Sequence, residues 1–156
     1  MGEQEDFDAA YAEVFRQAQA NMVPKLEDYE VFNIVKECKQ AVYWQAGATL
    51  MVGPLFVQPP ARTGHAYRVL VGGVAGASSP FSTTNFPAIV YDGDVQLADI
   101  GFDFSNIFDI RRAVGKAWAL KMAKSSEFIN SSDGDERAIF ENCKSMADAY
   151  RTPMVC

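Results

Sequence analysis

The side chains best suited to nucleophilic or metal chemistry in this chain are a single histidine, His65, and three cysteines. His65 lies in a short basic turn, with no cysteine or carboxylate at the spacing that zinc sites use. Cys38, Cys143 and Cys156 are too few and too irregularly spaced for a disulfide scaffold, so we expect free thiols, whose redox state the sequence leaves open. We therefore predict that the protein is not an enzyme, with no catalytic residue and no cofactor.

Two stretches could bind an ion or a nucleotide by composition. We predict that DGDVQLADIGFDF, residues 92–104, forms a turn followed by a short extended segment with solvated aspartates. These aspartates do not supply the oxygen ligands and the final glutamate of a calcium loop, so we predict no metal there. The glycine-rich VGGVAGASS, residues 71–79, lacks the Lys-Ser/Thr ending of a phosphate-binding loop. Neither stretch predicts a ligand.

Charge divides the chain into three predicted segments, residues 1–39, 40–91 and 92–156. The first carries nine acids and four bases, the last eleven acids and eight bases, and the middle one only Arg62 and Arg68. The net charge of −6 argues against nucleic acid as a partner. The uncharged middle third must be buried, either in lipid or in a protein core.

A membrane hairpin is our first interpretation of this middle third. Residues 40–61 are uncharged and long enough for the roughly 20-residue helix that crosses a bilayer. Tyr43 and Trp44 at its start fit an interfacial anchor. A second charge-free run spans residues 69–91, and we expect spans at about 40–58 and 68–90.

Small residues could let the two expected helices approach closely. Thr49 with Gly53 in the first run, and Gly72 with Gly76 in the second, have the four-residue spacing of helix-packing motifs. The alternative is a small soluble α+β domain in which residues 46–57 and 69–76 are buried strands. Glycine-rich strands and turns share this composition.

Amphipathic helices are expected on both sides of the middle third. Apolar residues recur at helical spacing over residues 6–20, and a second helix follows Pro24. Residues 105–124 form a basic amphipathic helix in which Arg111, Arg112, Lys116 and Lys121 could contact anionic lipid, including cardiolipin, or an acidic protein.

A short motif resembles the OCIA-domain family. Glu37-Cys38 is followed after four residues by Tyr43-Trp44, where that family has Phe-Trp, and Gly72 to Gly76 is similar to its glycine-alanine-glycine segment. The similarity covers about residues 30–80 and departs from the family at Ala41-Val42 and Gln45-Ala46. The resemblance implies two spans in the inner mitochondrial membrane, a role in respiratory-complex biogenesis, notably of complex III, and no enzymatic activity.

The resulting prediction is a mainly α protein with a two-helix transmembrane hairpin flanked by amphipathic helices. The loop 61–68 is basic, so by the positive-inside tendency it would face the matrix, with both termini toward the intermembrane space. The predicted role is that of an accessory or assembly subunit whose partners are subunits of a large membrane complex and membrane lipids. The alternative is a soluble protein-binding domain without catalytic activity.

Overall fold

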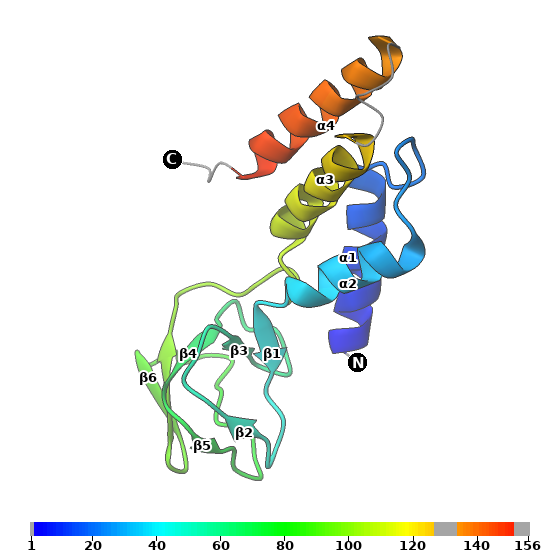
Figure 1. The fold of residues 1–156 in the computed structure, drawn as a ribbon. Helices are drawn as coiled ribbons and strands as arrows, with labels where there is room; N and C mark the ends of the chain where they lie inside the picture. Colours follow the sequence, from blue (N-terminus) through cyan, green and yellow to red (C-terminus); the bar gives the residue numbers. More distant parts are fainter. Residues whose placement is uncertain (1, 127–133, 152–156) are drawn as a thin grey trace. The chain divides into compact units, whose positions relative to one another are not determined.

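The computed structural model describes residues 2–126 and 134–151, with side chains for 2–126 and 137–150, and the chain forms two compact units (Figure 1). The first, called here the β unit, contains residues 2–6 and 39–107. The second, called the helical unit, contains residues 7–38 and the described residues from 108 onward.

The strands of the β unit form a five-stranded sheet and a separate pair. The sheet order is β1-β3-β4-β7-β6, with β1 and β3 parallel and the other neighbours antiparallel. The strands β2 and β5 pair antiparallel to each other. Their bounds are β1 Ala41–Tyr43, β2 Thr49–Leu50, β3 Phe56–Gln58, β4 Tyr67–Val71, β5 Gly73–Val74, β6 Ile89–Asp92 and β7 Val95–Asp99.

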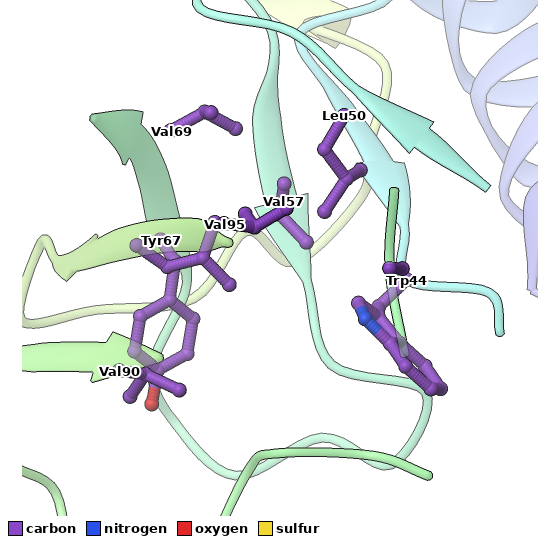
Figure 2. Packing of buried hydrophobic residues seen from close by; sticks show 9 residues of the cluster. Trp44, Leu50, Val57, Tyr67, Val69, Val90 and Val95 are labelled. Atoms are coloured by element: carbon purple, nitrogen blue, oxygen red, sulfur yellow. The ribbon is translucent and has the colours of Figure 1, made fainter. Parts of the chain in front are cut away.

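Alternation along the strands builds the core of the β unit. Val69, Leu97 and Val90 lie opposite one another on β4, β7 and β6, and all three are buried. Because successive strand residues point to opposite faces, their neighbours in sequence face outward. Figure 2 shows Val57, Val95 and Tyr67 packed in this core, with Leu50 and Trp44 beside them.

The helical unit contains most of α1 (Glu3–Gln17) together with α2 (Asp28–Glu37), α3 (Ile110–Ser126) and α4 (Gly134–Arg151). A capping box starts α2, because the side chain of Glu30 accepts a hydrogen bond of 2.9 Å from the backbone N–H of Glu27. The buried face of α3 contains Ala113, Val114, Ala117 and Trp118, at the spacing of one helical face.

The predicted membrane hairpin is wrong. Within the described ranges, no helix has the length and apolar content needed to cross a bilayer. The stretches expected to span, 40–58 and 68–90, instead contain strands β1, β2, β3 and β5, most of β4 and the start of β6. The mixed helix and sheet content fits the α+β alternative. An integral inner-membrane topology is not supported, because the described residues contain no spanning helix.

Glycine and proline residues divide the uncharged run into turns, loops and short strands. Gly47 adopts a positive φ of 74° in the turn before β2, a conformation that favours glycine. Gly53 and Pro54 lie in the exposed loop between β2 and β3. An uncharged run with such breaks buries alternate strand residues in a protein core, so it needs no lipid.

The amphipathic helices were predicted more accurately. The helix expected at 6–20 is α1, which begins and ends three residues earlier. The basic helix expected at 105–124 begins only at Ile110, because residues 105–109 are irregular.

Candidate functional site

Helix α3 starts at a capped turn that places three bases close together. The Oδ1 atom of Asp109 accepts a hydrogen bond of 3.1 Å from the backbone N–H of Arg112. A carboxylate in this position satisfies one of the unpaired N–H groups of the first turn. Arg111 and Arg112 lie in that turn, and Lys116 follows Arg112 by four residues, on the same side of the helix.

Helix α4 packs closely against α3 because α3 has a glycine at the contact. A Cβ atom added at Gly115 would lie 2.9 Å from the Cβ atom of Tyr150, too close for a side chain without movement. Arg111 joins the helices, since its Nη2 donates a 3.1 Å hydrogen bond to the Ala149 carbonyl. Its guanidinium also lies 5.3 Å from the centre of the Tyr150 ring, a cation–π contact.

A groove of about 420 Å³ lies between these two helices and is called here the α3–α4 groove. Its walls carry three bases and one acid, in a chain whose net charge is −6. The small residues Gly115, Ala119 and Ala147 leave the space open, and the Tyr150 ring forms part of its wall. The lining residues are Asp109, Arg111, Arg112, Gly115, Lys116, Ala119, Ala147 and Tyr150.

Arg112 is the base in this groove that is most available to a ligand. Its side chain is exposed, and the described residues give its guanidinium no ion-pair partner. Lys116 pairs with Glu37 at 3.2 Å, but the Glu37 side chain is 63% exposed. Such surface pairs contribute about 0–1 kcal/mol, so a ligand carboxylate can compete for Lys116.

Lys121 does not line the groove, although the sequence placed it in the same basic set. It is 1% exposed, and its ammonium donates hydrogen bonds to the carbonyls of Ala18 at 3.0 Å and Gln19 at 2.6 Å. Its Nζ lies 4.6 Å from the centre of the Trp118 ring. Burial lowers the pKa of Lys121, and the nearby Cys143 acts in the opposite direction. Lys121 therefore stabilises the helical unit and is not available to a partner.

Tyr43 and Trp44, predicted as membrane anchors, are structural residues of the β unit. The hydroxyl of Tyr43 donates to the Asp6 carboxylate at 3.0 Å. Trp44 is buried, and its indole N–H donates to Oδ2 of Asp92 at 2.8 Å. The other oxygen of Asp92 accepts a 3.0 Å bond from the backbone of Gly76. The anchor prediction is corrected, because these aromatic residues serve a protein core.

The four small residues predicted to pack helices lie on strands and loops. Thr49 is on β2, opposite Val74 of β5, and Gly53 is in the exposed loop that follows. A Cβ atom at Gly72 would lie 2.8 Å from the Leu50 carbonyl oxygen, and one at Gly76 would lie 2.7 Å from Oδ1 of Asp92. Gly72 therefore permits close approach of the backbone at Leu50, and Gly76 permits close approach of the Asp92 side chain. Neither glycine packs two helices together.

The potentially reactive side chains are held within the fold. Cys38 and Cys143 are free and buried, and burial raises the pKa of both thiols, while Cys156 lies outside the described residues. Nδ1 of His65 lies 2.7 Å from Oδ2 of Asp99, and its ring stacks on Phe86 at 3.9 Å. Among the described residues, no cluster of histidine, cysteine and acidic side chains could hold a metal ion.

Sequence reasoning missed an exposed aromatic patch on α1 and α2. Phe7, Tyr11, Asp28, Tyr29 and Phe32 line a shallow pocket in the helical unit, and Tyr29 is 66% exposed. Its one carboxylate, Asp28, already accepts a 3.3 Å hydrogen bond from the Tyr11 hydroxyl. Helical periodicity predicted that Phe7 and Tyr11 lie on the apolar face of a docked helix. The patch also includes residues of α2, so the pattern of one helix alone could not predict it. It offers apolar contact but no free charge.

Comparisons with known proteins do not assign the chain to a family. No protein-family model matches it, no curated protein matches its sequence, and no solved structure matches its fold. The similarity to the OCIA-domain family stays a prediction from one short motif.

Proposed function

We propose that this protein is a non-catalytic protein-binding module whose α3–α4 groove binds a short acidic segment of a partner protein. The observation that carries this proposal is the exposed Arg112 guanidinium, which has no ion-pair partner among the described residues and lies on the wall of an open groove. An arginine fork matches a carboxylate in bidentate geometry, so a glutamate or aspartate is the natural ligand.

The rest of the groove supports a peptide ligand. Gly115, Ala119 and Ala147 leave room for a chain, and Tyr150 offers an aromatic surface to an apolar side chain. Tyrosine and arginine are enriched among the residues that dominate binding energy at protein interfaces. The groove therefore suits an acidic segment with an apolar side chain near its carboxylates.

An anionic membrane surface is a weaker candidate for the same bases. A lipid-binding helix presents a row of bases toward head groups. Here Lys121 is buried, and Arg111 donates to Ala149, which shortens that row to Arg112 and Lys116. The proposed ligand is therefore a protein segment.

Replacing Arg112 with glutamine is expected to weaken binding of a synthetic oligoglutamate peptide by about tenfold, which equals about 1.4 kcal/mol. The neutral side chain keeps much of the length but loses the charge-assisted bidentate bond. Titration calorimetry at two salt concentrations measures the effect, and wild-type binding should weaken with salt because exposed charges are screened.

The matched control is Arg68→Gln, which removes the same charge from an exposed site on the β unit. We expect that variant to bind the peptide as wild type does. Equal losses of peptide affinity in both variants would mean that binding depends only on the net charge, which would contradict binding in the α3–α4 groove. Binding of phosphatidylglycerol vesicles, with no binding of the peptide, would favour the membrane alternative.

A further inference from the structure

The two edges of the five-stranded sheet differ in how they are covered. At one edge, the backbone N–H groups next to and within β1, those of Gln40 and Ala41, donate to the carbonyl of Ile107 at 2.8 and 3.3 Å. At the other edge, β6 pairs only with β7. The described residues offer no backbone hydrogen bond to the outer side of β6. Strand β6 is therefore an open edge.

The register of the β6–β7 hairpin identifies which backbone groups are unpaired. Asp92 lies opposite Val95 across the two-residue turn, and the N–H of Asp99 donates to the Ala88 carbonyl at 3.0 Å. In an antiparallel pair the bonded residues alternate, so Val90, like Ala88 and Asp92, points its N–H and C=O toward β7. The N–H and C=O groups of Ile89 and Tyr91 must then point away from the sheet.

The side chains on this edge do not protect it. Ile89 is 38% exposed and Tyr91 65% exposed, both on the outer face of the sheet. Natural open edges are usually protected by lysine, proline or a bulge, and the strand Ile89–Asp92 has none of these. Its one charge, Asp92, is buried against Trp44. The edge is thus suited to pairing with another strand.

We propose that β6 pairs antiparallel with β6 of a second copy of this chain, about a two-fold axis at Val90. In that register Ile89 lies opposite the second copy's Tyr91, and Tyr91 opposite its Ile89. All four outward-pointing groups of each strand are then bonded, and two isoleucine–tyrosine pairs form on the outer face. Aromatic and β-branched side chains are favourable cross-strand partners.

Other registers satisfy the edge less well. A shift by one residue would place buried side chains opposite exposed ones, because strand faces alternate. A shift by two would centre the axis on Tyr91 and place Ile89 opposite the second copy's Gly93. That glycine has a positive φ of 63° and lies in the turn outside the strand. The Val90 register is therefore the one that uses the whole edge.

A concentration series with the full chain tests this pairing. The interface is two short strands, so we expect a weak, concentration-dependent dimer in sedimentation experiments. Amide hydrogen exchange should slow with concentration at Ile89 and Tyr91, and stay unchanged at Val90, whose N–H is already bonded within the sheet. Acidic peptide is left out, so the result is independent of the α3–α4 groove.

Tyr91→Pro removes one outward N–H without removing a bond to β7, and we expect it to weaken the dimer at least tenfold. Ile89→Lys adds a charge to the edge and should act in the same direction, which guards against misfolding of the proline variant. Val52→Lys is the matched control, because Val52 is 64% exposed elsewhere on the β unit, and it should dimerise as wild type does.

A monomer at every concentration would overturn the proposal, leaving the edge to solvent or to a different chain. A dimer unaffected by both edge variants would overturn it too.

Discussion

Replacing Asp92 with alanine is expected to lower the free energy of unfolding by about 2–4 kcal/mol, measured by urea denaturation. Asp92 is 5% exposed and accepts bonds from the indole N–H of Trp44 and the backbone N–H of Gly76. Alanine would leave the Trp44 donor buried without a partner, and an orphaned buried donor costs more than the bond contributed.

Two variants make this prediction specific. Asp92→Asn keeps one acceptor oxygen and should lose about half as much stability as the alanine variant. Asp94→Ala removes a carboxylate from the exposed turn two residues away and should change stability by less than about 0.5 kcal/mol. A similar loss for Asp92→Ala and Asp94→Ala would contradict the bridging role of Asp92.

Replacing Lys121 with alanine is the second large change, with an expected loss of about 3 kcal/mol. The substitution leaves a cavity beside Trp118 and removes the donors to the carbonyls of Ala18 and Gln19. Lys121→Met fills most of the volume and should lose less. If Lys121→Ala unfolds at the same urea concentration as wild type, the lysine is not part of the core.

The stability contributed by Lys121 should also depend on pH. Burial lowers its pKa in the folded protein, so across the window from that lowered pKa up to 10.5 the unfolded chain binds more protons. Stability from this group must therefore rise with pH through the window. The raised pKa values of Cys38 and Cys143 act in the opposite direction, since burial holds their protons in the folded state.

Comparison with Lys121→Met removes the contribution of Cys38, which both proteins share. Loss of the ammonium also raises the pKa of Cys143 further in the variant, which changes the stability difference in the same direction. The stability difference, wild type minus Lys121→Met, should grow as the pH rises toward 10.5. A difference that shrinks over this range would show that the ammonium is favoured in the folded state.

Local signals in the sequence predicted the helices more accurately than the sheet, whose strands appeared only in the alternative interpretation and in the short extended segment after residue 92. Periodic apolar residues carry enough information to place α1 within three residues and to predict α3, although the start of α3 was placed five residues early. Strands of two to five residues, separated by glycines and prolines, carry too little periodicity to be separated from an uncharged helix. Because residues 40–91 contain no acid, the sequence then favoured lipid over a protein core as their environment.

The candidate site was predictable only where its residues lie on one helix. Arg111, Arg112 and Lys116 lie on one helix, so helical spacing alone brings them together. Lys121 has the same charge and a compatible spacing, but its burial depends on Ala18 and Gln19, about a hundred residues earlier. Asp92 was likewise predicted to be solvated, because its partner Trp44 is distant in sequence. Contacts of this range are not encoded in any local pattern.

The most direct test of the proposed function is a titration of the isotope-labelled protein with the oligoglutamate peptide, followed by NMR. We predict saturable shifts of the side-chain Nε–H signal of Arg112 and of the backbone amides of Gly115, Ala147 and Tyr150, which line the α3–α4 groove. Signals of the β unit should stay in place. Shifts centred instead on Tyr29 and Phe32 of the aromatic patch, or no saturable shift at all, would contradict an acidic ligand in the groove.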